Sequence, residues 1–288
     1  FINTYLNLDG TPFTSNPNYV TEPFMEEVKN RDKRLKQTIR TKGYTRINGG
    51  QQVMSPPLFS HTYTGYQPIK WVNADMSLDG GSRSNSLIPI IRYAEVLLNF
   101  AEAKAELGSL TDEDWAASIG LLRKRAGITN GLNNKPVIVD AYLKSTFYPN
   151  INDPVILEVR RERGIELALE GLRFYDVIRW KLGELFTKTW NGMYVSQLNT
   201  PIDLNEDGVL DVGFVNGNAS NPVAGVTYIN VAQNVGGQVN SMQLSEGNKG
   251  EIIWLNNIPR VWSDRMYLYP IPENDLLMNP KLGQNPNW

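Results

Sequence analysis

The chain has 288 residues, of which 41% are hydrophobic, and its 28 basic and 30 acidic residues give a formal net charge of -2. This balance provides no basic field for nucleic acid or for an anionic membrane surface, so we expect no nucleic-acid partner. The sequence contains no cysteine, which excludes disulfides, thiol catalysis and cysteine–metal sites. No apolar run approaches the ~20 residues of a membrane-crossing helix.

The first predicted element is a surface helix at residues 22–41, followed by an irregular segment. An interrupted apolar stripe runs among charged side chains and consists of Phe24, Met25, Val28, Leu35 and Ile39. Gly43 ends this helix. Residues 43–83 then show little periodicity and many aromatic side chains, which is typical of an ordered loop.

Helical patterning dominates the centre of the chain. A helix is predicted at residues 90–107, with alanines that permit close packing and with Gly108 as a left-handed cap. The next helix begins with Thr111 and Asp114, which have the spacing of a capping box, and it ends at Gly127. The short link between the two helices predicts an antiparallel pair.

A further helix is predicted to begin at Asp153, with Pro154 in its first turn, and to carry an unusual density of charge. Glutamates recur every four residues on one face and meet arginines at helical spacing; they are Glu162, Glu166 and Glu170. Gly171 separates this helix from a second charged segment at residues 173–180. Buried charges persist only when they are paired and hydrogen-bonded. We therefore interpret the segment as two helices joined by partly buried ion pairs, a structural network and not a catalytic site.

The helical pattern weakens after residue 186. Gly, Asn, Pro and Ser are abundant from there to the end, which predicts turns and irregular structure. Candidate short strands lie at residues 225–231 and 251–255.

Several segments, taken in order, resemble the SusD/RagB family of outer-membrane nutrient-binding lipoproteins. The matching segments are residues 92–108 (RYAEVLLNFAEAKAELG), 123–127 (RKRAG), 158–180, 269–273 (YPIPE), 279–280 (NP) and 284–288 (QNPNW). Asn287 stands where the family usually has glycine. The resemblance covers roughly residues 60–288 by motif and residues 1–59 by position.

The resemblance implies a mainly α-helical, SusD-like fold with tetratricopeptide-like helix pairs, long irregular loops and a few short strands. It also implies that residues 1–288 form a single SusD-like domain, the C-terminal portion of a longer protein whose N-terminal half, signal peptide and lipid-bearing cysteine lie outside this sequence. The implied function is non-catalytic. An outward-facing outer-membrane lipoprotein would capture glycans or related nutrients and pass them to a TonB-dependent, SusC-like transporter, with membrane contact only through its lipid anchor.

Two other functions remain open, namely a glycoside hydrolase and an architectural helical-repeat module that binds only its transporter. A hydrolase needs a carboxyl with a raised pKa, whereas arginine neighbours keep Glu162 and Glu166 ionised. His61 is the only histidine in the sequence, and no Gly-x-Ser-x-Gly motif is present. We therefore expect no catalytic residue and no required cofactor.

Candidate glycan-binding residues gather in the loop that precedes residue 90. Sugar rings place their apolar faces on aromatic side chains, while polar side chains bond the hydroxyls. The candidates are His61, Tyr63, Tyr66, Lys70, Trp71 and Asn73. For each ring taken alone, filling a gap between loop and helices is the alternative role. A second aromatic group, Trp190, Tyr194, Trp254 and Trp262, has no motif to recommend it.

A partial calcium-loop pattern lies in the C-terminal part of the chain. Its candidate ligands follow the spacing that wraps a hard cation, with Gly208 at the sixth loop position, and are Asp203, Asn205, Asp207, Val209 and Asp211. Phe214 occupies the position that normally supplies a bidentate glutamate. The alternative is a polar turn in which the same side chains satisfy their own backbone. Calcium therefore stays an optional ligand in this interpretation.

Overall fold

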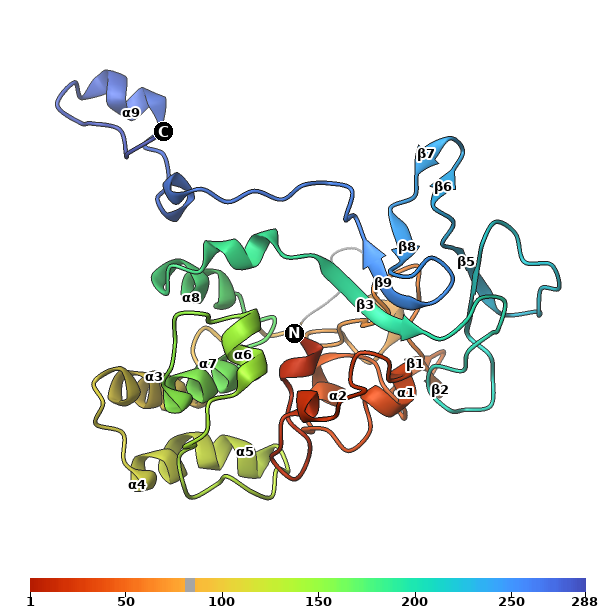
Figure 1. Ribbon diagram of the computed structural model, residues 1–288, viewed down its shortest axis with the longest axis horizontal. Coiled ribbons are helices and arrows are strands. Elements are labelled where there is room, and N and C mark those ends of the chain that lie inside the picture. Colours follow the sequence, from red (N-terminus) through yellow and green to blue (C-terminus); the bar gives the residue numbers. More distant parts are fainter. Residues whose placement is uncertain (81–85) are drawn as a thin grey trace.

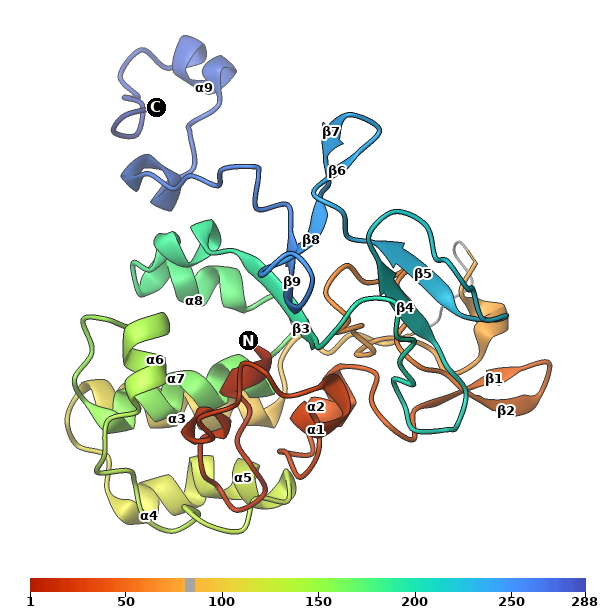
Figure 2. The same cartoon turned by 45° about the vertical axis from the view of Figure 1, so that its right-hand side comes forward.

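The structure is a computed structural model that describes residues 1–80 and 86–288. Helices gather on one side of the body and short strands on the other, and a C-terminal arm projects away from both (Figures 1 and 2). The N-terminal residues run between the helical and the β-rich side. The expected mainly α-helical class with few short strands is confirmed.

The described helices are α1 (Phe24–Glu27), α2 (Leu35–Thr38), α3 (Tyr93–Glu106), α4 (Asp112–Trp115), α5 (Leu121–Arg125), α6 (Ala141–Thr146), α7 (Pro154–Glu166), α8 (Arg173–Arg179) and α9 (Glu273–Met278). The strands are β1 (Thr45–Asn48), β2 (Gln51–Met54), β3 (Trp190–Val195), β4 (Val212–Val215), β5 (Thr227–Asn230), β6 (Asn234–Val235), β7 (Gln238–Val239), β8 (Met242–Leu244) and β9 (Gly250–Trp254). Within the described ranges, no helix combines the length and the apolar character that a bilayer crossing requires.

On the helical side, α3 packs against α7 and against the segment that contains α4 and α5. Leu98 and Ala101 of α3 are fully buried in this contact, together with Trp115 and Ile119. Val159 of α7 completes the same apolar cluster. Alanine in α3 allows the neighbouring helices to approach closely, so the predicted helix pairing is confirmed.

The predicted start and end signals of these helices are also confirmed. The Thr111 side chain accepts from the backbone of Asp114, and the Asp114 side chain accepts from the backbone of Thr111. Asp153 caps α7 by accepting two backbone N–H groups. Gly108 and Gly127 adopt left-handed φ values of 64° and 82°, which glycine tolerates without steric cost. Local hydrogen bonding thus sets these boundaries.

The predicted helix at residues 111–127 is continuous but widens in the middle. A π-helical segment, Ala116–Gly120, lies between α4 and α5. Here the backbone of a later loop crosses the helix, since a Cβ placed on Gly120 would lie 2.1 Å from the carbonyl oxygen of Leu132. Only glycine permits this approach.

The predicted surface helix at residues 22–41 is wrong. Instead, α1 and α2 are separate four-residue helices. Asn30 between them adopts a left-handed φ of 54°, which an α-helix does not accommodate. Arg31 is buried, and its guanidinium donates to the backbone carbonyls of Ile2 and Tyr5. Long-range bonds to the N-terminal segment therefore fix this stretch in place of a continuing helix.

The segment predicted as loop, residues 43–83, contains a hairpin. Strands β1 and β2 pair in antiparallel fashion around Gly49 and Gly50, whose φ values are 57° and 81°. Two left-handed residues in succession are what a tight hairpin turn requires. A short 3₁₀ helix, Met76–Leu78, follows later. Residues 81–83 of the predicted loop lie outside the described residues.

On the β-rich side, β3, β9 and β8 form an antiparallel sheet, and β4 and β5 form a parallel pair. The expected strands at residues 225–231 and 251–255 correspond to β5 and β9. Both groups cover a second apolar core with the N-terminal helices, and its buried members include Phe24, Met193, Phe214 and Ile252.

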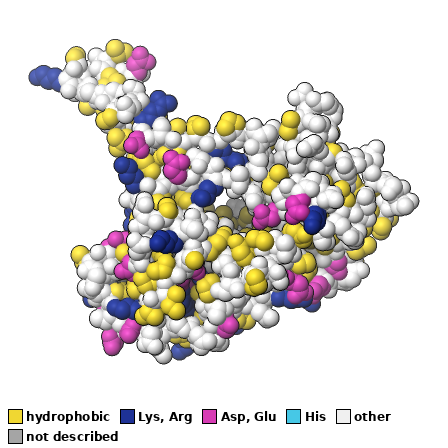
Figure 3. Space-filling view, viewed as in Figure 1, with side chains coloured by type: hydrophobic (Ala, Val, Ile, Leu, Met, Phe, Trp, Pro, Cys, Tyr) yellow, Lys and Arg dark blue, Asp and Glu magenta, His cyan; other side chains and the backbone are white. Residues whose placement is uncertain are grey.

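The C-terminal arm, residues 264–288, folds on itself. The Gln284 side chain bonds both the N–H and the carbonyl of Ile271, at 2.8 and 2.9 Å. The Trp288 indole donates to the carbonyl of Leu268 at 2.9 Å. Asn287 takes a left-handed φ of 65°, a conformation that asparagine tolerates better than most residues. Figure 3 shows the folded arm standing clear of the body.

Candidate functional site

A buried network of ion pairs joins the N-terminal segment to α5 and α7. Glu162 on α7 is fully buried, and its carboxylate accepts from Arg34 at 2.9 Å and from Arg123 at 2.6 Å. Arg34 also bonds Asp32, and Arg123 also bonds Glu158. The predicted paired and buried charges are confirmed. Arg34 is a member that helical spacing could not indicate, because it comes from a distant segment.

A second group of ion pairs joins α7 to α8 and α3. Arg163 of α7 donates to Asp176 of α8 at 2.7 Å, and Asp176 also accepts from Arg179 at 3.0 Å. Arg179 in turn bonds Glu102 of α3 at 2.5 and 2.6 Å. Three helices are therefore tied together by charges, as the spacing across Gly171 predicted for α7 and α8.

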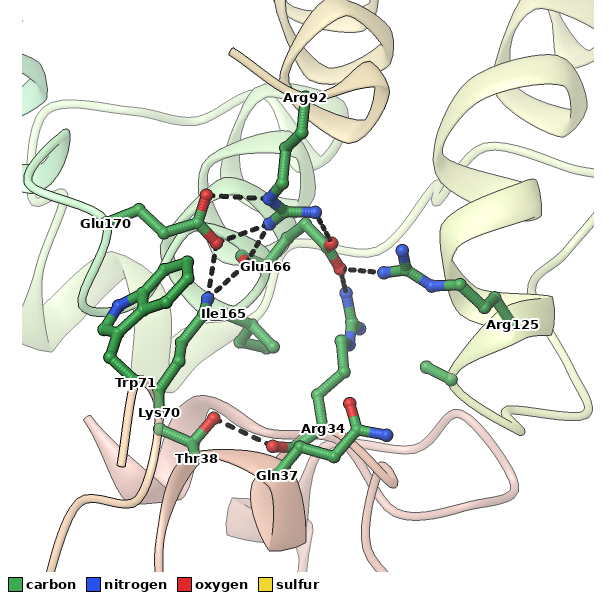
Figure 4. Close-up of a pocket in the computed structure, with 11 residues that line it drawn as sticks. Arg34, Gln37, Thr38, Lys70, Trp71, Arg92, Arg125, Ile165, Glu166 and Glu170 are labelled. Atoms are coloured by element: carbon green, nitrogen blue, oxygen red, sulfur yellow. Dashed lines mark hydrogen bonds and ion pairs between the residues drawn. The ribbon is translucent and has the colours of Figure 1, made fainter. Parts of the chain in front are cut away.

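A cavity of about 360 Å³ opens beside this network (Figure 4). In its wall the Glu166 carboxylate accepts from Arg34 at 3.0 Å and from Arg92 and Arg125 at 2.5 Å each. Burial alone would raise the pKa of Glu166, but the hydrogen bonds from Arg125 and Arg92 and the charge of Arg34 lower it to about 2. This carboxyl is ionised at neutral pH and cannot serve as a general acid.

Two of the candidate ligand residues, Lys70 and Trp71, also line this cavity (Figure 4). Lys70 pairs with Glu170 and donates to the carbonyl of Ala168 at 2.8 Å. The Trp71 indole donates to the carbonyl of Leu169 at 2.8 Å. Their polar atoms are thus used within the protein, and the Lys70 ammonium also lies over the Trp71 ring, 5.7 Å from its centroid.

A stack of aromatic rings lies on the β-rich side. Tyr63 is stacked on Trp254, with ring centroids 4.7 Å apart and an interplanar angle of 5°. Trp190 is stacked on the same indole at 5.1 Å and 13°. Tyr63 is 56% exposed and Trp190 is 51% exposed. We call Tyr63, Trp254 and Trp190 the aromatic stack. It unites one candidate from the early loop with two from the second aromatic group.

Strand pairing and one close approach hold the aromatic stack. Trp190 and Trp254 are direct partners in the antiparallel pairing of β3 with β9. The loop that carries Tyr63 is fixed by the backbone N–H of Met193, which donates to the carbonyl of Thr64 at 2.9 Å. Sequence separation concealed this group, since no local spacing relates Tyr63 to the two strands.

Gly192 is the residue that lets the Tyr63 loop approach β3. A Cβ placed there would lie 2.4 Å from the carbonyl oxygen of Thr64. We expect Gly192→Ala to displace the loop, to unstack Tyr63 from Trp254 and to lower the free energy of unfolding by about 1–3 kcal/mol. Urea unfolding measures the loss. Gly283→Ala on the arm is the control, because a Cβ there meets nothing within 4 Å. Equal stability of both variants would contradict this prediction.

The remaining candidates from the early loop have partners outside the aromatic stack. The Tyr66 hydroxyl donates to the carboxylate of buried Glu27 at 2.8 and 2.9 Å. Asn73 accepts from Arg46 through its backbone carbonyl at 2.8 Å. His61 is exposed, and its ring lies 2.8 Å from the Ser60 hydroxyl. The structure therefore does not bring the early-loop candidates together on one surface.

The rest of the second aromatic group has other neighbours. Trp262 packs on Phe186 and Tyr267, with ring centroids 5.3 and 5.1 Å apart, and joins the arm to the body. Tyr194 lies in β3 opposite Glu251 and is half-buried.

The loop with the calcium-like pattern uses its carboxylates on its own backbone. Asp203 accepts from the N–H groups of Asn205 and Gly208, at 3.1 and 2.8 Å, and Asp207 accepts from that of Val209 at 2.9 Å. Burial raises the pKa of Asp211, and the charges of Asp203 and Asp207 add to the rise. Among residues 1–80 and 86–288, no group of three or more His, Cys, Asp or Glu side chains could hold a metal ion.

Calcium binding at this loop stays a prediction, and calorimetry tests it. If calcium binds, we expect an excess of 100 times the dissociation constant to stabilise the protein by about 2.7 kcal/mol. Asp207→Ala should remove that gain, whereas Asp275→Ala, at an exposed position on α9, should keep it. Absence of binding heat, or binding that Asp207→Ala leaves unchanged, would favour the polar-turn interpretation.

The chain was compared with protein-family models, with curated proteins and with solved structures. The family model described as the SusD family matches residues 1–288, the whole chain. A curated relative, "SusD-like protein P2" of Formosa agariphila, is 39% identical over 105 residues, which are 36% of this chain and 19% of that protein.

Solved structures that match this chain include two from Bacteroides fragilis. A SusD-like protein is 22% identical with a TM-score of 0.61, and the match covers 100% of this chain and 46% of that one. A SusD-like carbohydrate-binding protein is 29% identical with a TM-score of 0.48, and the match covers 67% of this chain and 37% of that one. The chain thus spans less than half the length of these relatives. Because the family model matches its full extent, the chain belongs to the SusD family.

Proposed function

We propose that this protein captures glycans at the cell surface and passes them to a TonB-dependent outer-membrane transporter. The observation that carries the proposal is the exposed aromatic stack of Tyr63, Trp254 and Trp190. The protein's membership of the SusD family supports the same function.

The chemistry of the aromatic stack suits sugar rings. The C–H groups on one face of a pyranose form a flat apolar surface that packs on an aromatic ring, while the hydroxyls at its rim stay hydrated or bond polar groups. Tyr63 and Trp190 leave more than half of their surface open to solvent. Large exposed apolar groups that are held rigidly together are typical of binding surfaces.

The remaining parts of the proposal concern the whole protein. Family resemblance supports an outward-facing, lipid-anchored protein of the outer membrane that works beside a SusC-like transporter. A binding protein of this kind needs no chemical step, since it raises the local concentration of glycan near the transporter. Retention of a bound glycan then depends on contacts such as the aromatic stack.

Binding to a panel of polysaccharides, measured by affinity electrophoresis and calorimetry, tests the proposal. We expect the protein to bind at least one glycan and Trp190→Ala or Tyr63→Ala to weaken that binding about tenfold or more, the loss of a contact worth over 1 kcal/mol. Tyr269→Ala is the matched control, because Tyr269 is 74% exposed but lies on the arm.

Two results would count against the proposal. If no glycan in the panel binds, the architectural alternative gains support. If a glycan binds but the variants in the aromatic stack bind it as tightly as the wild type does, the site lies elsewhere, for example on the Trp71 face of the charged cavity. Release of reducing ends from a bound glycan would instead indicate a hydrolase.

A further inference from the structure

Arg260 lies next to the aromatic stack, on its Trp190 side. The guanidinium carbon of Arg260 lies 4.5 Å from the centroid of the Trp190 ring. Arg260 follows β9 by a few residues, so the same strand end supplies both Trp254 and this cation. A guanidinium on an aromatic face gains a modest cation–π attraction and keeps its N–H groups at the edge of its plane.

This guanidinium has little else to bond. Within residues 1–80 and 86–288 it forms no ion pair, and its hydrogen bond is a long one, at 3.5 Å to the carbonyl of Trp254. Other arginines of this protein, such as Arg34, Arg92 and Arg123, are bound to carboxylates. Arg260 therefore keeps donors that are available to a ligand.

The nearest acidic residue on the same strand lies on the other side of the sheet. Side chains alternate along β9, which places Glu251 and Trp254 on opposite faces. The Glu251 carboxylate is also engaged, since it accepts from the Asn191 side chain at 2.9 Å. No acid of β9 thus neutralises the end of the aromatic stack that Arg260 occupies.

We propose that the aromatic stack and Arg260 together recognise a glycan that carries an anionic substituent, a carboxylate or a sulfate ester. One sugar ring packs on the exposed parts of Tyr63 and Trp190, and the anionic substituent of that sugar or of its neighbour in the glycan accepts hydrogen bonds from the Arg260 guanidinium. Planar guanidinium groups bind such anions in a two-point manner that lysine cannot reproduce. This inference rests on the proposed function and specifies its ligand class.

Matched pairs of polysaccharides test this inference on the chain as it stands. Polygalacturonate is compared with its methyl-esterified form, and dextran sulfate with dextran, so that the carboxylate and the sulfate are tested separately. We expect the wild type to bind the charged member of at least one pair more tightly. Arg260→Gln should reduce binding of that member roughly ten- to hundredfold, because hydrogen bonds to charged groups are among the strong ones. Arg260→Lys should recover only part of it.

Arg265→Gln is a closely matched control. Arg265 also stacks on a tryptophan, Trp288, at 4.8 Å and also has one long hydrogen bond of 3.5 Å to a backbone carbonyl, but it lies on the arm. This variant should bind like the wild type. An unchanged free energy of unfolding for Arg260→Gln checks that the β3–β9 pairing that holds Trp190 is kept.

The outcomes separate the inference from the function on which it rests. If Arg260→Gln and Arg265→Gln reduce binding of the charged glycan equally, the attraction is nonspecific and the inference is overturned. If a neutral glycan binds through Trp190 with no preference for charge, glycan capture stands and the anionic ligand class is wrong. If neither charged polysaccharide binds, the anionic ligand class is rejected, whereas glycan capture is rejected only if the wider polysaccharide panel also shows no binding.

Discussion

Replacement of Glu162 by alanine is expected to lower the free energy of unfolding by about 3–5 kcal/mol, the usual cost of breaking a buried ion pair by removing one partner. Glu162 is 0% exposed and pairs with both Arg34 and Arg123. Arg34 and Arg123 are themselves only 5% and 4% exposed, so water cannot replace the missing carboxylate. Two positive charges then remain buried next to each other.

Urea unfolding followed by circular dichroism measures this effect. Glu246→Ala is the control, because Glu246 pairs with Lys249 at 3.3 Å and the two side chains are 52% and 49% exposed. An exposed pair of this kind contributes about 0–1 kcal/mol. A cost for Glu162→Ala as small as that for Glu246→Ala would mean that water or other carboxylates compensate the arginines, and the network would not hold α5, α7 and the N-terminal segment together.

The second large effect concerns Glu27 and the pH dependence of stability. Burial raises the pKa of Glu27 to about 7 from the ordinary 4.5, although the Tyr66 hydroxyl and the charge of Arg31 act in the opposite direction. Because the folded state holds this proton more tightly, its stabilising contribution is complete below pH 4.5 and is lost as the pH rises through about 7. Full loss corresponds to about 3 kcal/mol.

Glu27→Gln should remove this dependence. We expect the difference in unfolding free energy between variant and wild type to change by about 3 kcal/mol from roughly pH 4 to roughly pH 8, in favour of the variant at high pH. Glu26→Gln is the matched control, because Glu26 is the neighbouring residue and its side chain is 53% exposed. A constant difference across this pH range would show that Glu27 titrates normally in the folded protein.

Part of the charge pairing on α7 could be predicted from the sequence. The four-residue spacing of Glu162 and Glu166 and the pairing of α7 with α8 follow from helical geometry, so both could be expected from the sequence. The contribution of Arg34 could not, because it reaches these glutamates from a segment whose own conformation was predicted wrongly. That error had a specific cause: Arg31 bonds the carbonyls of Ile2 and Tyr5, and such bonds leave no periodic signal.

The candidate site was only partly predictable. Tyr63 was expected to bind a ligand, but the same reasoning grouped it with Tyr66, whose hydroxyl holds the buried Glu27. Aromatic composition marks a region and does not show which rings face solvent. Arg260 and Gly192 had no signal in the sequence, since a lone arginine and a lone glycine acquire meaning only from the atoms that approach them.

The sequence by itself determined the family, the helix starts and ends at Thr111, Asp153 and Gly108, and the pairing of charges on α7. Each depends on residues within a few positions of one another, where hydrogen bonding and helical spacing act. The tertiary structure alone decided that Tyr63, Trp190 and Trp254 form one surface. Their stacking requires strand pairing and a loop contact across long separations in the chain, and the free energy of such contacts depends on the packing of the whole β-rich side.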